Sequence, residues 1–205
     1  MEISTFLYFL TASVLLTIAP GPDILYLLTK SLSEGAKSGI SLACGLVSGI
    51  FFHTMLVMLG IAALIQNSPT ALNIIKYFGA AYLLFLAYGA FKSSGKIKLG
   101  QADSKTSYFS NYKRGLLMNV LNPKVLLFFL AFLPQFIDIT NNSVSIQIAL
   151  LGLTFALQAL AIFSIIAVCA AHLRKIILKN QNLGKTFAMI EGIVLTGIAI
   201  TLILN

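Results

Sequence analysis

Six long apolar segments constrain this chain more than any other feature of its sequence. A helix needs about 20 mostly apolar residues to cross the hydrocarbon core of a bilayer. Segments of this kind fill almost the whole chain and leave room only for short connections: 3–28, 38–65, 71–91, 113–134, 146–171 and 186–204. Only 10% of the residues are charged and 58% are hydrophobic, which excludes a water-soluble globular domain. The sequence therefore predicts an all-α, polytopic membrane protein with six transmembrane helices.

Basic residues are concentrated in three of the connections. The loops 29–37, 92–114 and 172–185 contain every Lys and Arg of the chain except Lys76 and Lys124. Because Lys and Arg in short loops are retained on the cytoplasmic side, these loops are predicted to be cytoplasmic and both termini to lie on the opposite side. A re-entrant first segment would instead put the N-terminus in the cytoplasm, and the sequence leaves this alternative open. The loop cations explain the net charge of +8 without a nucleic-acid partner.

The two halves of the chain carry similar signals. Residues 1–92 and 113–205 are predicted to be three-helix repeats, joined by a polar cytoplasmic linker at 93–112. When the halves are aligned without gaps, Gly21-Pro22-Asp23 falls on Asn122-Pro123-Lys124, so each half has a helix breaker and a charge at the same place. Because each half has an odd number of spans, the second repeat enters the membrane in the opposite sense. This pattern predicts an inverted repeat, as in many secondary transporters.

The prolines predict that the first and fourth spans are broken or kinked. Pro20 and Pro22 flank Gly21, and Pro123 stands at the matching place in the second half. Proline removes a backbone donor and clashes with the preceding turn. The open carbonyls then need partners from other helices, water or a ligand, and irregular backbone at membrane depth is tolerated where it lines a cavity. The alternative is a proline kink that serves only helix packing.

Asp23 and Lys124 are the strongest candidates for a substrate site. A charge on a membrane helix costs about 3 kcal/mol or more, so it persists mostly where it is paired or faces water. A zwitterionic amino acid could exchange partners with a buried carboxylate and ammonium. Two structural roles compete with this interpretation: an interior ion pair that joins the repeats, or Asp23 as N-cap of the second half-helix.

The other polar residues of the spans give weaker signals. Asn119 and Asn122 flank the second break and are expected to support its packing, and His53 is expected to be a hydrogen-bonded interior histidine. Glu191 is expected near the cytoplasmic interface, with Lys185 or water as its partner. Asp23, Glu191 and His53 are the candidates for proton coupling. Small residues on the second span predict close helix contacts: Gly35, Gly39, Gly45 and Gly49.

Other functional classes find little support in the sequence. Ser/His/Asp constellations, phosphate loops and HExxH motifs of enzymes are missing, so the chain is not expected to be an enzyme, and no cofactor is predicted. An exporter of metal or other small cations is the main alternative. A heavy-metal exporter would need soft or imidazole ligands at depth, and the chain offers Cys44, Cys169, His53 and, near a loop, His172. A thiol-disulfide conduit would place cysteines beside the breaks, where this chain has Asp23 and Lys124.

Several motifs together resemble the lysine exporter / homoserine-threonine resistance (LysE/RhtB) family of amino-acid translocators. The resemblance covers nearly the whole chain and depends on five runs: Ala19-Pro20-Gly21-Pro22-Asp23, Gly35-Ala36-Lys37-Ser38-Gly39 through Gly45 to His53, Phe78-Gly79-Ala80-Ala81-Tyr82-Leu83, Asn119-Val120-Leu121-Asn122-Pro123-Lys124 and Phe132-Leu133-Pro134-Gln135-Phe136. It implies a multi-pass protein of the bacterial inner membrane that exports amino acids with the proton gradient as energy source. Glu191 has no expected counterpart in the family pattern.

The sequence thus predicts a secondary exporter that alternates access around the two broken helices. Its partners are expected to be an amino-acid substrate, protons and the lipid bilayer, while the amino acid exported and any homo-oligomer are left open. The predicted substrate-binding residues come from both breaks: Asp23, Lys124, Asn119, Asn122, Pro20, Gly21, Pro22 and Pro123.

Overall fold

The computed structural model describes residues 2–67, 69–93, 106–138, 144–173 and 183–204. All regular structure within these ranges is helical, which confirms the all-α prediction. The helices are α1 (Ile3–Ile18), α2 (Pro22–Glu34), α3 (Ala36–Asn67), α4 (Pro69–Lys92), α5 (Tyr108–Val120), α6 (Pro123–Leu127), the π-helix η1 (Phe128–Phe132), the 3-10 helix η2 (Leu133–Phe136), α7 (Val144–His172) and α9 (Leu183–Leu204).

These helices supply four candidate membrane spans, or six if each of two bent helix pairs crosses the membrane as one span. Four are single helices that are long and apolar enough to cross a bilayer: Ala36–Gly60, Thr70–Lys92, Val144–His172 and Gly184–Leu204. The other two are bent pairs, Ile3–Ile18 with Pro22–Glu34 at 56° and Tyr108–Val120 with Pro123–Phe136 at 48°. The chain is therefore a multi-pass membrane protein, and the helices of the first and fourth predicted segments are broken at the prolines, as predicted.

Proline explains where both spans break. Pro22 is the first residue of α2 and Pro123 is the first residue of α6. At this position the missing N–H costs nothing, because the first N–H groups of a helix have no partner within it, and the fixed φ of proline suits the helix. Gly21 is the N-cap of α2, and Asn122 is the N-cap of α6.

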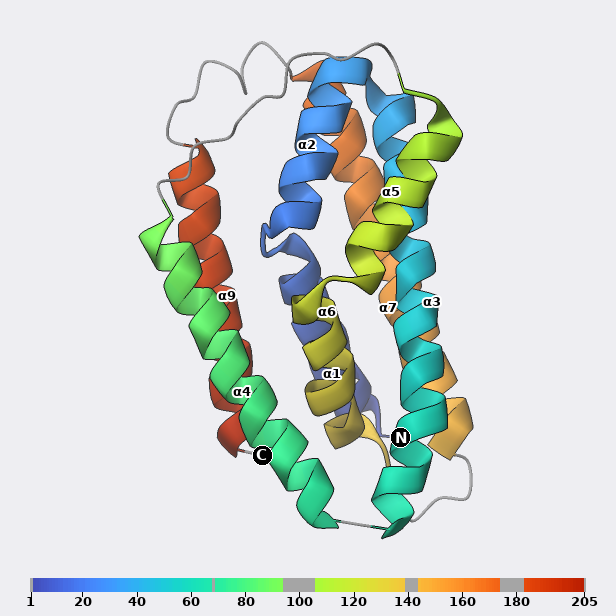
Figure 1. The fold of residues 1–205 in the computed structure, drawn as a ribbon, viewed down its shortest axis with the longest axis vertical. Coiled ribbons are helices and arrows are strands. Elements are labelled where there is room, and N and C mark those ends of the chain that lie inside the picture. The colour runs from blue at the N-terminus through green and yellow to red at the C-terminus, as the bar shows by residue number, and fades with distance from the viewer. Residues whose placement is uncertain (1, 68, 94–105, 139–143, 174–182, 205) are drawn as a thin grey trace.

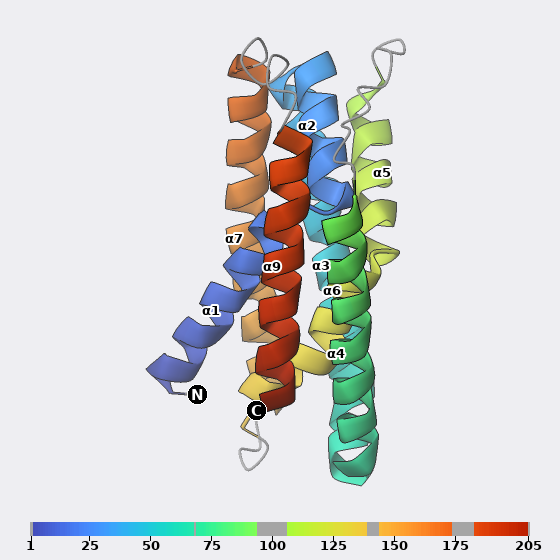
Figure 2. The same ribbon diagram turned by 90° about the vertical axis from the view of Figure 1, so that its left-hand side faces the viewer.

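The two bent spans run through the molecule in opposite directions. In Figure 1, α1 leads up to α2, whereas α5 leads down to α6. The end of α2, the end of α4, the start of α5, the end of α7 and the start of α9 lie toward one end of the molecule, and Figure 2 shows both chain ends toward the opposite end. The predicted cation-rich loops thus connect helix ends on one side. The opposite directions favour two inverted repeats, which stay a prediction.

Close helix contacts hold the core together. The helix α3 packs along α5 and α7, and α4 pairs with α9. An ideal Cβ on Gly45 would lie 2.0 Å from the carbonyl oxygen of Tyr112, and one on Gly115 would lie 2.2 Å from that of Leu42, so the backbones of α3 and α5 touch. The predicted role of the small residues in close helix contacts is confirmed at Gly45, and Gly39 likewise packs against Ala167 of α7.

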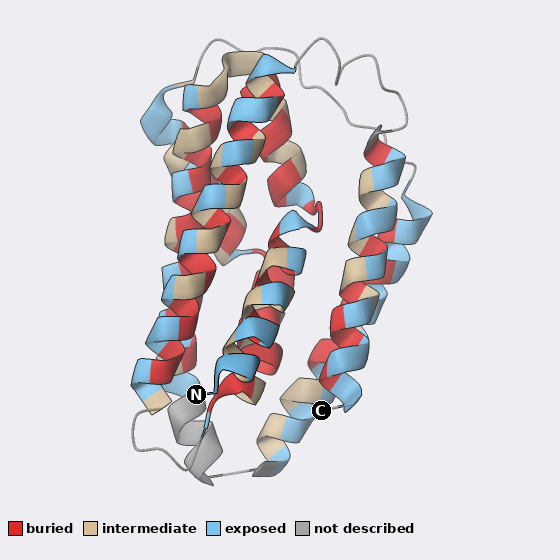
Figure 3. Cartoon of the chain, turned by 180° about the vertical axis from the view of Figure 1, so that it is seen from behind, coloured by how far each residue is buried: buried red, intermediate tan, exposed pale blue. Residues whose placement is uncertain are grey.

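Burial follows the pattern expected of a helix bundle in lipid. Figure 3 shows buried residues on the inward faces of the helices and exposed residues on the outside. The exposed faces are themselves apolar, as Leu59, Phe85 and Ile193 illustrate. An outward apolar face suits contact with acyl chains. The polar residues described next are therefore interior groups of a membrane protein.

Candidate functional site

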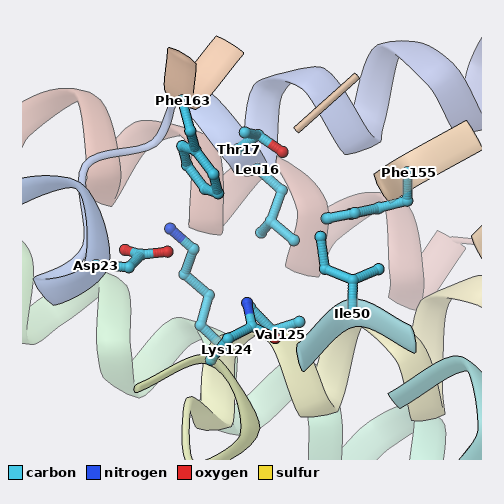
Figure 4. Close-up of a pocket in the computed structure, with 9 residues that line it drawn as sticks. Leu16, Thr17, Asp23, Ile50, Lys124, Val125, Phe155 and Phe163 are labelled. Carbon is cyan, nitrogen blue, oxygen red and sulfur yellow. The ribbon is translucent and has the colours of Figure 1, made fainter. Parts of the chain in front are cut away.

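The two helix breaks bring Asp23 and Lys124 to one small pocket. Both side chains are buried, and each residue has only 4% of its surface exposed. The pocket lies between the bent spans, α3 and α7, and Figure 4 shows both charged groups on one side of it. Its lining also includes Leu16, Thr17, Ile50, Asn119, Val125, Phe155 and Phe163. The two charges thus face the protein interior, as their cost in lipid requires.

Lys124 joins the second break to the first. Its ammonium nitrogen donates a hydrogen bond to the carbonyl oxygen of Ala19, at 2.6 Å. Ala19 directly follows α1, so Lys124 satisfies one of the carbonyls that the break opens. The backbone N–H of Lys124 donates to the side-chain oxygen of Asn122, at 3.0 Å. Asn122 therefore caps α6, which holds the lysine at the start of that helix.

The structure corrects both alternative roles of Asp23. Among the described residues, Lys30 and Glu34 form the only salt bridge within 4.0 Å, so Asp23 and Lys124 are not directly paired. The N-cap of α2 is Gly21, and Asp23 stands in the first turn. A carboxylate in the first turn is stabilised by the helix dipole. The Oδ1 atom of Asp23 is buried without a hydrogen-bond partner, which leaves it free to accept a bond from a ligand.

Gly21 is the point at which three charged side chains converge. An ideal Cβ on Gly21 would lie 2.9 Å from Oδ1 of Asp23, 3.3 Å from Nζ of Lys124 and 3.4 Å from Oε1 of Glu191. Glu191 comes from α9 and is partly buried. Sequence reasoning placed its carboxylate at the cytoplasmic interface with Lys185 or water. The structure instead directs it toward the break of the first span.

His53 of α3 supports the second break through Asn119, near the end of α5. The ring Nε2 of His53 donates to the carbonyl oxygen of Asn119, at 3.0 Å, and the histidine is fully buried. This is the interior hydrogen bond that the sequence analysis expected of His53. Gly49 of α3 packs against the Asn119 side chain, whose Oδ1 lacks a partner and which lines the pocket. Asn119 thus combines packing with an open acceptor.

Sequence reasoning missed the apolar wall of the pocket. Leu16, Ile50 and Phe155 lie away from the charged groups in Figure 4, and Val125 and Phe163 complete the lining. Nothing distinguishes these residues from other apolar residues in apolar spans, because only the three-dimensional contacts place them together. The pocket therefore has a charged end and an apolar end.

The pocket is small in this conformation. Its cavity volume is about 10 Å³. Such a space holds about one water molecule. An amino acid is several times larger, so its binding requires the surrounding helices to separate.

Other candidate chemistry lies elsewhere or is not assembled. Cys44 and Cys169 are free and exposed, and neither lines the pocket. In the part of the chain that the structure describes, no three His, Cys, Asp or Glu side chains gather closely enough to hold a metal ion. The described residues around the breaks therefore provide one ammonium group, carboxylates and an apolar wall.

Comparisons with known proteins give one consistent family. Residues 14–205 match the family described as LysE type translocator. A leucine efflux protein of Salmonella typhimurium is 29% identical over 195 residues, which cover 93% of this chain and 91% of the relative. A Bacillus subtilis protein named "Uncharacterized membrane protein YrhP" is 30% identical over 203 residues, which cover 95% of this chain and 96% of the relative. No solved structure matches the chain.

Proposed function

The chain belongs to the LysE type translocator family, and from this premise we propose that it exports amino acids with neutral, apolar side chains across the bacterial inner membrane. The leucine efflux proteins of Salmonella, which match over most of both chains, support amino-acid export. The proposed orientation has the cation-rich end of the molecule in the cytoplasm, because basic loops are retained there.

One observation carries this proposal: a buried carboxylate and a buried ammonium line the same pocket without pairing with each other. A free amino acid presents the two complementary groups. Its carboxylate suits Lys124, and its ammonium suits the open Oδ1 of Asp23. The apolar wall of Leu16, Ile50 and Phe155 then suits an aliphatic side chain better than a charged one, because burial of an unpaired charge is costly.

Helix movement around the breaks would give the substrate access from each side in turn. The half-helices α2 and α5 lie toward the cation-rich end, and α1 and α6 lie toward the other end (Figure 1). Movement of one three-helix repeat against the other would open the pocket to one side and close it to the other. The proton gradient is the proposed energy source, with Asp23, Glu191 and His53 as candidate proton carriers.

The test is the loss of export when the charged groups are removed. Cells that overproduce the protein are expected to accumulate leucine or a related amino acid outside the cell. Lys124→Ala and Asp23→Asn are each expected to lower the efflux rate about tenfold or more, because each leaves a substrate charge buried without its partner. Efflux is measured with labelled leucine in preloaded cells.

The matched control is Lys76→Ala, because the ammonium of Lys76 lies over the ring of Tyr77 and does not line the pocket. This variant is expected to export like the wild type at equal membrane level. Near-normal efflux from both Lys124→Ala and Asp23→Asn would contradict the proposed site. Efflux that continues unchanged after a protonophore collapses the proton gradient would contradict proton coupling.

A further inference from the structure

Glu191 approaches the candidate site from a helix that the pocket lining does not include. Its Oε1 atom lies 3.4 Å from the position of an ideal Cβ on Gly21, on the same side of Gly21 as Asp23 and Lys124. The residue belongs to α9, whereas Asp23 belongs to α2 and Lys124 to α6. Three spans that are distant in sequence thus direct charged groups to one point.

The charges at this point do not balance. Two carboxylates, Asp23 and Glu191, face one ammonium, Lys124, and neither carboxylate lies within salt-bridge distance of it. Lys124 already donates to Ala19, and Oδ1 of Asp23 is buried without a partner. Unpaired negative charge at membrane depth is costly, so a cationic group that enters between the carboxylates would be stabilised.

The helix α4, which packs against α9, brings no cationic side chain to Glu191 that could take the place of a ligand. At this level α4 presents the ring of Phe91 to Gly192, the residue that follows Glu191. Lys92 of α4 lies over the ring of Tyr88 on its own helix. Among the described titratable residues, Asp23 and Lys124 are therefore the groups that face Glu191.

We infer that Glu191 is a third charged residue of the substrate site and that it contacts the ammonium group of the bound amino acid together with Asp23. This inference rests on the proposed function. Because the pocket is too small for an amino acid, the site has to widen on binding. The charged end of the substrate then lies toward Gly21, the residue that Glu191 approaches, while the substrate side chain remains against the apolar wall.

The test compares ligands that keep or lack the ammonium group. The full-length protein in lipid nanodiscs binds labelled leucine, and unlabelled 4-methylpentanoate and 3-methylbutylamine compete for the site. The first competitor is leucine without its amino group, and the second is leucine without its carboxylate. Glu191→Gln is expected to weaken binding of leucine and of the amine about tenfold or more, because one carboxylate partner of the ammonium is lost.

Glu191→Gln is expected to leave binding of 4-methylpentanoate unchanged, a selectivity that a purely structural role would not produce. The matched control is Glu2→Gln, whose carboxylate is exposed next to Ser4 and remote from the pocket. Equal weakening of the acid and the amine would overturn the inference, and so would wild-type affinity for all three ligands. Failure of the wild type itself to bind or export leucine would instead contradict the proposed function.

Discussion

The charged groups around Gly21, more than its backbone conformation, explain why this residue has no side chain. Its φ of −89° and ψ of −171° are extended values that other residues also adopt, so alanine is not strained there. A methyl group would nevertheless lie 2.9 Å from Oδ1 of Asp23 and 3.3 Å from Nζ of Lys124. Both atoms are ends of flexible side chains, so the fold can adjust while the geometry of the site changes.

Gly21→Ala is therefore expected to separate stability from transport. The variant should insert and unfold like the wild type. Its leucine efflux should fall about tenfold or more, because displaced Asp23 and Lys124 side chains lose most of their binding free energy for the charged groups of the substrate. Gly60→Ala is the matched control, because nothing lies within 4 Å of its Cβ position. Wild-type efflux from Gly21→Ala would show that transport does not depend on the positions of the three charged groups around Gly21.

The free-energy cost of a charged side chain in lipid is what makes individual residues of the site predictable from the sequence. Asp23 and Lys124 could be selected from the sequence because deep charges are expensive and therefore have a reason to be present. Glu191 could be selected as an ionisable residue of a span, but the direction of its side chain could not be predicted. Sequence gives a position along a helix and not the distance between α9 and α2. The apolar wall of Ile50 and Phe155 carried no signal, since its residue types fill every span.

At the scale of elements, the contact between α3 and α5 positions the second break. The backbones meet at Gly45 and Gly115, where added side chains would strike carbonyl oxygens of the opposite helix. Tyr112 of α5 also donates to Ser48 of α3, at 3.0 Å. Because backbone atoms cannot rotate away as side chains do, a larger residue at this contact has to separate the helices.

Gly115→Val is expected to destabilise the protein by about 1–3 kcal/mol, the usual cost of overpacking a tight contact. Thermal unfolding in detergent, followed by circular dichroism, measures the effect as a lower midpoint. Gly89→Val is the matched control, because its Cβ position on α4 is open. Equal midpoints for the two variants would contradict a tight seam between α3 and α5.

The breaks were predictable as elements, whereas the exact course of the fourth span was not. Proline at 22 and 123 identifies the start of a helix through its fixed φ and missing donor. The sequence placed the fourth span at 113–134, but α5 begins at Tyr108, with Ser107 as a capping residue. Beyond Leu127 the helix changes to π and then to 3-10 geometry before Ile137. Pro134 cannot donate to the preceding turn, but its presence alone does not specify which irregular turn replaces the α-helix.

At the scale of the whole molecule, a polar network closes the cation-rich end between the two broken spans. The carboxylate of Glu34, at the end of α2, accepts hydrogen bonds from Thr106 and Asn111 at the start of the fourth span. Lys30 completes the network through its salt bridge to Glu34 at 2.5 Å. Closer to the break, the guanidinium carbon of Arg114 on α5 lies 4.4 Å from the ring centroid of Tyr26 on α2. Opening the pocket toward this end requires α2 and α5 to separate and these bonds to break.

Glu34→Gln is expected to shift the protein toward conformations that are open at the cation-rich end, because the neutral amide loses the charge-assisted bonds to Lys30 and Thr106. A population shift of this kind needs only about 1–2 kcal/mol. The measurement uses Ile50→Cys in a background with Cys44 and Cys169 replaced by Ser. Inside-out vesicles expose the cytoplasmic side to a membrane-impermeant thiol reagent, and Ile50→Cys is expected to react several-fold faster when Glu34→Gln is also present. Glu2→Gln should leave the rate unchanged. Faster labelling from the opposite side, in right-side-out vesicles, would contradict the prediction, because it would show that the network does not close the cation-rich end.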